Sequence, residues 1–239
     1  MKDSVRVVKD LQKMGHALPD NSFFRTRYLR NIVGRKRRKN IDGAWQGLMV
    51  SILSTRQRST GGNNRTKIAL ASPYLKWSEV CSNETNIAKY VQGFTDNRKK
   101  LQFLLEAFEW LSDQTNWHKI KLYQRKILSV DVDQREERLK IERSAAKLLT
   151  DIRGIGPKQS RNFWQYRGYS VWTIPLDSRV QKIITQAPFG INLDIKRDYE
   201  TIEEQLALLC SKAKTYPCML DASLFDLEAM VRAKVGLPP

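Results

Sequence analysis

The stretch Asp151–Arg161, DIRGIGPKQSR, combines two glycines, a proline and a lysine between two helix-favouring segments. A glycine that ends a helix permits left-handed backbone, and a second glycine leaves the next turn open to close approach by another molecule. Pro157 suits the first turn of a new helix, where its missing N–H costs nothing. Amides at a helix start bind phosphate, and Lys158 stands beside them. The stretch predicts a phosphate-binding helical hairpin, with an ordinary turn between helices as the alternative.

A carboxylate follows in the stretch Ile174–Val180, IPLDSRV. Asp177 is predicted to be a helix N-cap, because Asp accepts hydrogen bonds from the first amides of a helix and Pro175 lies just before the turn. Most aspartates in such places do no more than cap. Asp177 nevertheless follows Lys158 by 19 residues, which one helix and a return loop would fill. We therefore expect both side chains to face one cleft.

Apolar residues recur at helical spacing along most of the chain. They predict amphipathic helices over 97–113 and 134–149, a more buried helix over 43–55, and further apolar stripes over 199–209 and 220–231. Strand-like alternation is short wherever it occurs, as at 170–174. The predicted breaks are 61–64, 72–73, 93 and 187–190. The sequence predicts an all-α protein of about ten helices, wrapped as one domain with two lobes.

The charge favours a polyanionic partner. Lys and Arg number 42 against 25 Asp and Glu, a net charge of +17. Such an excess costs self-repulsion unless a polyanion binds, and nucleic acid is the first candidate. The cations are concentrated in one segment that contains Arg25, Arg27, Arg30, Arg35, Lys36, Arg37, Arg38 and Lys39. A solvated charged face is the alternative for this segment.

Several other classes of protein are disfavoured. The N-terminus lacks the apolar core of a secretion signal, and no apolar run reaches membrane-spanning length. The cysteines, Cys81, Cys210 and Cys218, are odd in number and suit a reducing cytosol. With His16 and His118 as the only histidines, neither a zinc site nor a histidine-based triad is expected. These features predict a cytoplasmic protein, associated with the nucleoid in a prokaryote.

Four sequence stretches resemble the helix-hairpin-helix DNA glycosylases, the superfamily of endonuclease III and 8-oxoguanine DNA glycosylase. GIGPKQSRNFWQYRGY and IPLDSRV are most similar to the small single-domain 8-oxoguanine DNA glycosylase/AP lyases. WQGLMVSILSTRQRST resembles the buried helix of the family, and YVQGFTDNRKKLQFLLEAF its glycine-turned helix pair. The resemblance implies one domain over 1–239, with two helical lobes around a DNA-binding cleft. Residues 1–40 would form basic N-terminal helices, and 148–183 the hairpin and catalytic loop.

The resemblance also implies roles for two residues. Asp177 matches the essential carboxylate, which would stabilise the oxocarbenium-like sugar as the N-glycosidic bond breaks. Lys158 matches the nucleophile of the bifunctional members, whose neutral amine attacks C1′, forms a Schiff base and permits β-elimination. A simple phosphate contact is the alternative for Lys158.

DNA contacts and a base pocket follow from the same resemblance. Arg56 falls where relatives carry the residue that fills the gap left by a flipped base, and Gln57 is next to it. A phosphate contact is the alternative for Arg56. The pocket is expected between Trp45, Arg56 and Gln57 on one side and Phe225 and Asp226 on the other, with a core position as the alternative for Phe225. The full set of expected DNA-binding residues is Gly154, Gly156, Lys158, Arg56, Gln57, Arg35, Lys36, Arg37, Arg38 and Arg179.

Some features depart from the family. Cys210 and Cys218 cannot supply the four thiolates of an iron–sulfur cluster, so no cofactor is expected beyond an optional monovalent cation at the hairpin. The last helix, in LDASLFDLEAMVRAKVGLPP, differs from that of the 8-oxoguanine enzymes. The family default is excision of an 8-oxoguanine-type purine from double-stranded DNA by a monomer. Excision of a bulky hypermodified base, such as a phage modified cytosine, in antiviral defence is one alternative, and a non-enzymatic DNA-binding protein is the other.

Overall fold

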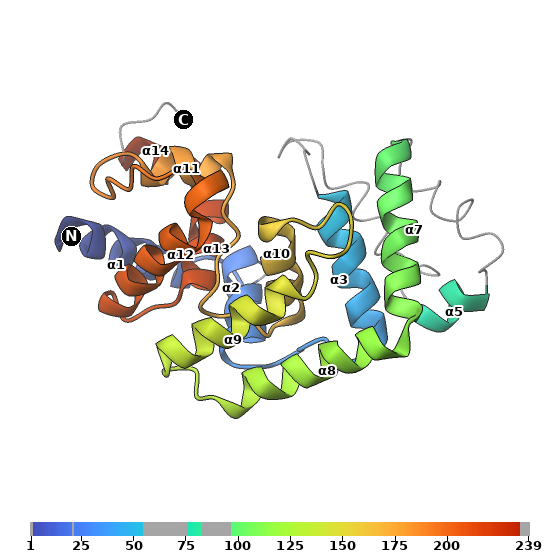
Figure 1. Ribbon diagram of the computed structural model, residues 1–239. Helices are drawn as coiled ribbons and strands as arrows, with labels where there is room; N and C mark the ends of the chain where they lie inside the picture. The colour runs from blue at the N-terminus through green and yellow to red at the C-terminus, as the bar shows by residue number, and fades with distance from the viewer. Residues whose placement is uncertain (1, 21, 55–75, 83–96, 235–239) are drawn as a thin grey trace. The chain divides into compact units, whose positions relative to one another are not determined.

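The computed structural model describes residues 2–20, 22–54, 76–82 and 97–234, and within these ranges it contains helices but no strands (Figure 1). The prediction of an all-α protein is therefore confirmed. None of the described helices is long and apolar enough to cross a membrane. The helices are α1 (Lys2–His16), α2 (Phe23–Arg27), a π-helix (Tyr28–Ile32), α3 (Ile41–Leu53), α5 (Trp77–Ser82), α7 (Arg98–Ser112), α8 (Gln114–Ser129), α9 (Arg135–Lys147), α10 (Pro157–Arg167), α11 (Ser178–Ile184), α12 (Ile195–Lys212), α13 (Pro217–Asp226) and α14 (Glu228–Lys234).

The chain divides into two compact units that are interleaved in sequence. Unit 1 consists of Met1–Arg37, Val130–Glu142 and Gly168–Pro239, and unit 2 of Arg38–Ser129 and Arg143–Arg167. Helix α9 contributes its first residues to unit 1 and its last residues to unit 2. Each unit therefore depends on segments that are far apart in the sequence.

Three of the predicted helices are found close to their predicted limits. The apolar pattern over 97–113 corresponds to α7, that over 43–55 to α3, and that over 134–149 to α9. The last apolar stripe instead forms two helices, because Leu227 leaves helical geometry with φ −114° and ψ 22° and separates α13 from α14.

Helix α3 is the centre of unit 2. Asn40 caps the start of this helix, because its Oδ1 accepts from the Gly43 amide at 3.0 Å. A Cβ on Gly47 would lie 2.8 Å from the Phe163 ring, so the absence of a side chain at Gly47 allows α10 to pack closely on α3. This contact fixes α10, the second helix of the predicted hairpin.

The core of unit 1 is formed by apolar side chains of α1, α11, α12, α13 and α14 with the chain that leads into α11. Its largest contributors are aliphatic, which is consistent with the regular apolar stripes of α12 and α13. The buried residues include Leu11, Ile174, Leu176, Ile183, Ile202, Leu206, Leu220, Leu224 and Val231.

The chain that leads into α11 is buried and lies outside the helices, and it bends at Val171 and Trp172. Residues 168–176 are all buried. The Glu142 carboxylate, on α9, accepts from the amides of Val171, Trp172 and Thr173 at 2.8 to 3.0 Å. The Ser170 hydroxyl donates to the same carboxylate at 3.1 Å. One buried side chain therefore satisfies three consecutive amides at the point where the chain bends.

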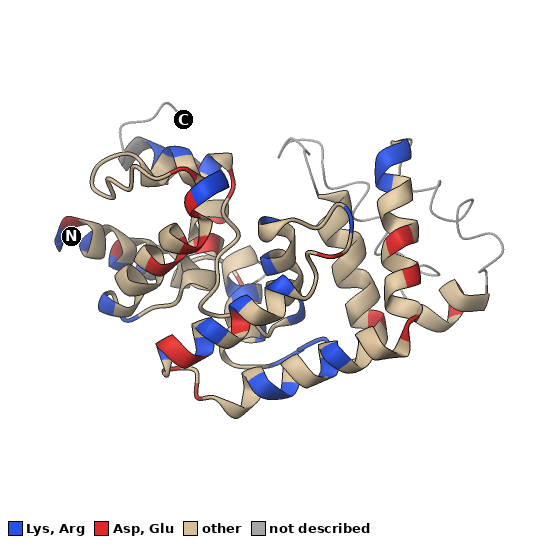
Figure 2. Ribbon diagram, viewed as in Figure 1, with Lys and Arg blue, Asp and Glu red and all other residues tan. Residues whose placement is uncertain are grey.

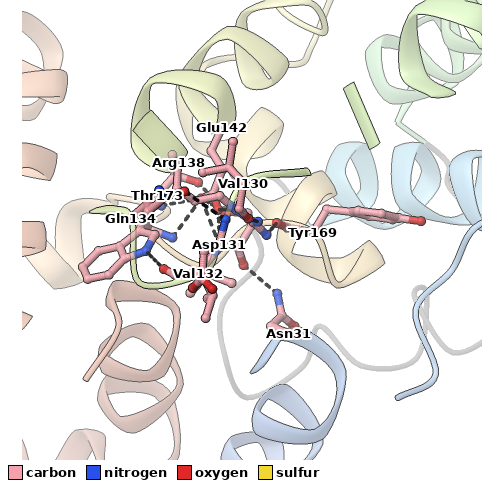
Figure 3. A network of polar contacts seen from close by, with 12 residues as sticks. Asn31, Val130, Asp131, Val132, Gln134, Arg138, Glu142, Tyr169 and Thr173 are labelled. Carbon is pink, nitrogen blue, oxygen red and sulfur yellow. Dashed lines mark hydrogen bonds and ion pairs between the residues drawn. The ribbon is translucent and has the colours of Figure 1, made fainter. Parts of the chain in front are cut away.

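Arg138 completes this network from one turn earlier on α9 (Figure 3). Its Nε donates to Glu142 at 3.1 Å, and its Nη1 and Nη2 donate to the carbonyls of Val130 at 2.7 Å and Tyr169 at 3.4 Å. Burial raises the pKa of the Glu142 carboxyl, while Arg138 and the three amides act in the opposite direction. Every partner of Glu142 is a donor, so the network uses it as an acceptor.

Side chains of helix α12 bind the backbone of the residues that follow, 174–176. The Ile174 amide donates to the Glu203 carboxylate at 3.1 Å, and the Leu176 amide donates to the Tyr199 hydroxyl at 2.8 Å. The Tyr199 hydroxyl in turn donates to the Ile174 carbonyl at 3.0 Å. The backbone immediately before Asp177 is thus held by side chains from α9 and α12.

Substituting Glu142→Gln should destabilise the protein by about 3 kcal/mol. The NH₂ group of the glutamine would face the backbone amides that now donate to Glu142, and the buried charge of Arg138 would lose its partner. Equilibrium unfolding in urea measures this as a lower midpoint. Glu137→Gln is the matched control, since Glu137 is exposed on the same helix. Equal stability of the two variants would contradict the role given to Glu142.

Candidate functional site

The helical hairpin is present in unit 2. Helix α9 ends at Lys147, α10 begins at Pro157, and a series of turns joins them. The Thr150 amide donates to the Lys147 carbonyl at 3.1 Å, and the Ile155 amide donates to the Ile152 carbonyl at 3.0 Å. The prediction of two helices joined through the glycines, with proline at the start of the second, is confirmed. The connection is longer than a glycine-terminated helix requires, because α9 ends well before Gly154.

The two glycines of the hairpin have different physical roles. Gly154 has φ +88°, and a Cβ there would lie 2.4 Å from the Phe103 ring of α7. Gly154 is therefore required for the fold of the turn. A Cβ on Gly156 would meet only the Gln159 Oε1, at 4.0 Å. The backbone at Gly156 is thus open to close approach from outside.

Lys158 lies half-buried in the first turn of α10. The first backbone bond of that helix runs from the Ser160 amide to the Gly156 carbonyl at 3.0 Å. The amides that precede Ser160 therefore belong to the helix start, where the helix dipole favours an anion. Lys158, Gly156 and Gly154 are brought together here, as the sequence predicts.

Asp177 is the N-cap of α11, as predicted, and it belongs to unit 1. Its Oδ1 accepts from the amides of Arg179 and Val180, each at 3.0 Å. Its side chain keeps 16% of its surface exposed. The backbone amides orient the carboxylate.

The Arg179 guanidinium binds the other carboxylate oxygen of Asp177. The sequence did not reveal this ion pair. The guanidinium Nε and Nη2 donate to Asp177 Oδ2 at 3.3 and 3.0 Å, and Nη1 lies 3.7 Å from the Glu228 carboxylate. Burial lowers the pKa of Arg179, but Asp177 and Glu228 outweigh it, so the pKa is raised overall. The only sequence signal for this pair is the spacing of two residues across a helix start. Because the Arg179 side chain is 43% exposed, it has room to exchange partners.

The basic N-terminal segment separates into structural and exposed cations. Arg37 Nε donates to the Gly168 carbonyl at 3.0 Å in unit 1. Arg38 lies 4.2 Å from the centre of the Tyr166 ring in unit 2 and donates to the Gln46 side chain. Arg35 and Lys36 are exposed. A single DNA-binding role for these four residues is therefore too simple, because Arg37 and Arg38 also support the fold.

Phe225 and Asp226 lie at the end of α13 in unit 1. Phe225 is 53% exposed, and its ring lies 4.9 Å from that of Phe23. The alternative of a core position for Phe225 is therefore excluded, and its role in a base pocket stays a prediction. Asp226 Oδ2 accepts from the Phe24 amide at 2.7 Å and thereby caps α2. A base would have to compete with that amide for Oδ2.

The prediction for Trp45 needs correction. Trp45 is 0% exposed and packs 5.7 Å from the Trp77 ring and 6.2 Å from the Phe108 ring. It is a core residue of α3 and presents no surface to a base. The helical spacing that predicted a buried helix was the better guide to Trp45. Arg56 and Gln57 lie outside the described residues.

The fold is similar to that of a characterised enzyme. The chain superposes on the crystal structure of the 8-oxoguanine DNA glycosylase of Methanocaldococcus jannaschii with a TM-score of 0.57 and 15% sequence identity, covering 94% of each chain. No protein-family model matches the sequence, and no curated protein matches it. The structural similarity establishes that the chain has the helical fold of this glycosylase.

The two hairpin glycines provide a matched test of the site. Gly154→Ala should destabilise the protein by about 2–4 kcal/mol, because the new Cβ combines an unfavourable left-handed backbone with overlap on Phe103. Gly156→Ala should change stability by less than about 1 kcal/mol, because its surroundings are open. Urea unfolding of both variants measures the difference. A comparable loss in both would contradict the distinction drawn between the two glycines.

Proposed function

We propose that the protein is a DNA glycosylase that excises a damaged or modified base from double-stranded DNA as a monomer. The observation that carries the proposal is the Asp177 carboxylate, oriented by two amides at the start of α11 and partly exposed. The glycosylase fold supports the same reading, as does the open backbone at the start of α10.

Asp177 acts on the sugar in this proposal. Breaking the N-glycosidic bond leaves positive charge on C1′ and the ring oxygen, and a fixed anion stabilises that charge in the transition state. The backbone amides hold Asp177 in place before the reaction, so little reorganisation is needed at the moment of bond cleavage.

Arg179 has to release Asp177 Oδ2 for this step. With Arg179 in place, four donors surround the carboxylate, and the guanidinium opposes positive charge on a nearby sugar. A DNA phosphate offers the guanidinium an equivalent bidentate partner. Binding of the DNA backbone at α11 would thus free the carboxylate that acts on the sugar.

Lys158 adds the lyase step. Its neutral amine attacks C1′ as the bond to the base breaks, and the base leaves with the bonding electrons and takes up a proton. The attacking amine loses a proton, the C1′–O4′ bond breaks as O4′ takes up a proton, and a Schiff base forms between Lys158 and C1′. The Schiff base then loses a proton from C2′, and the C3′–O bond breaks with departure of the 3′ phosphate. The close approach of a phosphate at Gly156 would position the strand for this reaction.

Asp177→Asn should lower base release by about 1,000-fold or more while leaving duplex affinity nearly unchanged, because Asn keeps the cap but not the charge. Single-turnover release of the base from damaged duplex measures the rate. Asp194→Asn is the matched control, since Asp194 caps α12 through the Lys196 amide at 2.9 Å. Full activity of Asp177→Asn would remove Asp177 from the mechanism.

Borohydride should trap a covalent complex between the protein and a substrate duplex, because a Schiff base is reducible. The adduct should be lost in Lys158→Gln and retained in Lys147→Gln, which changes an exposed lysine at the end of α9. An undiminished adduct in Lys158→Gln would move the nucleophile elsewhere, and no adduct in the parent protein would make the enzyme monofunctional.

The base itself is proposed to be an 8-oxoguanine-type purine. Mass spectrometry of the bases released from DNA that carries diverse modifications tests this choice directly. Release of a bulky modified base instead would favour a role in antiviral defence. DNA binding without release of any base would identify a non-enzymatic DNA-binding protein.

A further inference from the structure

Helix α8 carries a concentration of positive charge that the proposed active site does not use (Figure 2). Its sixteen residues contain Lys119, Lys121, Arg125 and Lys126, and no acidic residue occurs between Asp113 and Asp131. Three of the four cations are exposed and Lys121 is half-buried. Within the described part of the chain, none of the four forms an ion pair. Among the residues that the structure describes, this charge is therefore uncompensated.

Aromatic side chains are interleaved with these cations. The Lys121 amine lies 5.7 Å from the centre of the Trp117 ring, and the Lys126 amine lies 5.6 Å from that of Tyr123. Both rings are half-buried. Such contacts limit the freedom of the lysine stems and hold the amines near the helix surface. The side chains of Lys121 and Lys126 are therefore partly ordered before binding, which lowers the entropic cost of binding an extended partner.

The opposite side of α8 anchors the helix to unit 2. Ile120, Gln124 and Ile127 are its buried residues. With the Gln124 amide oriented toward α10, its oxygen accepts from Arg167 Nη2 at 2.6 Å. The Arg167 guanidinium also lies 5.8 Å from the Trp117 ring, and its Nε donates to the Arg38 carbonyl at 3.1 Å. Helix α8 is thus fixed against the end of α10.

This attachment places the cations of α8 away from the hairpin. Arg167 is the last residue of α10, whereas Pro157 and Lys158 form its first turn. Eleven residues of α-helix span about 15 Å. In Figure 1, α8 lies along the lower edge of unit 2, beside the start of α3, and the turns that join α9 to α10 lie beside the end of α3. The hairpin and the α8 cations are therefore separate surfaces of one unit.

We propose that the exposed face of α8 binds the phosphate backbone of a second segment of double-stranded DNA. The face is defined by Lys119, Lys121, Arg125 and Lys126. Lys121 and Arg125 are four residues apart, or about 6 Å along the helix axis, and Lys119 and Lys126 are seven residues apart, or about 10 Å. These spacings are on the scale of neighbouring backbone phosphates. The proposal does not depend on glycosylase activity, because it concerns binding alone.

The chemistry of the face favours DNA over an acidic protein. Phosphate-backbone binding needs a row of cations with donors and no shaped pocket, and it is independent of sequence. A protein partner would need a buried apolar centre as well. The exposed apolar residues of α8, Leu122 and Leu128, are 42% and 44% exposed and lie six residues apart, so they do not form such a centre.

A bridging assay with the full chain tests the proposal. An immobilised duplex is loaded with less protein than it can bind, and a fluorescent duplex of unrelated sequence is then added. The parent protein should capture the second duplex. Neutralising the face with Lys119→Gln, Lys121→Gln, Arg125→Gln and Lys126→Gln should reduce capture by about tenfold or more at low salt, since each lost phosphate contact weakens binding. Affinity for the first duplex should stay within about twofold of the parent value.

Two matched variants control for net charge and folding. Arg6→Gln, Lys9→Gln, Lys13→Gln and Lys196→Gln together remove the same charge from exposed positions in unit 1 and should leave capture within about twofold of the parent value. Lys119→Arg, Lys121→Arg, Arg125→Lys and Lys126→Arg keep the charge of α8 and should preserve capture. Circular dichroism and light scattering establish that each variant is folded and monomeric.

Four outcomes would overturn the proposal. The first is that the parent protein captures no second duplex, and the second is that the neutralised variant captures as much as the parent. The third is that the neutralised variant loses affinity for the first duplex as well as capture of the second, which would assign α8 to the same DNA segment as the hairpin. Binding of polyglutamate through α8 without capture of a second duplex would assign the face to an acidic protein.

Discussion

The Glu142 carboxylate is the interaction on which the proposed site most directly depends. A buried backbone that lies outside a helix or a sheet leaves amides that cannot reach water, and each unsatisfied amide costs about 1–3 kcal/mol. Glu142 satisfies three consecutive amides, and Arg138 supports it while binding two carbonyls on either side. Non-helical backbone can therefore pass through the interior of unit 1 to the start of α11.

That segment determines where Asp177 stands. Its amides and carbonyls are held from α9 by Glu142 and from α12 by Glu203 and Tyr199. The chain is fixed up to Leu176, and the next residue caps α11. The carboxylate that we propose to act on the sugar is thus oriented by buried polar contacts on one side and by helix amides on the other. A group that must be ready before the reaction benefits from such support.

In unit 2, glycines position the hairpin by allowing helices and turns to pack closely. Gly47 brings α10 onto α3, and Gly154 brings the turns after α9 onto Phe103 of α7. Gly156 differs from both because its surroundings are open. Gly47 and Gly154 thus allow the close packing that positions the hairpin, and Gly156 leaves its backbone accessible. The cations are divided in a similar way. Arg37 and Arg167 donate to backbone carbonyls and Arg38 donates to the Gln46 side chain, whereas three of the four cations of α8 are exposed.

The sequence by itself determined the helical class, the limits of α3, α7 and α9, the hairpin with Pro157 at a helix start, and the capping role of Asp177. These features depend on neighbours within a few residues, through helical periodicity, backbone freedom and the unpaired amides of a helix end. Tertiary structure decided which side chains are accessible and which charges are already paired. Trp45 is buried by Trp77 and Phe108, and Asp226 is engaged by the Phe24 amide, 202 residues away. The sequence likewise did not reveal that Glu142 accepts from the amides of Val171, Trp172 and Thr173, because these residues are 29 to 31 positions away. Contacts between distant segments follow from the way the helices pack, and no local pattern encodes them.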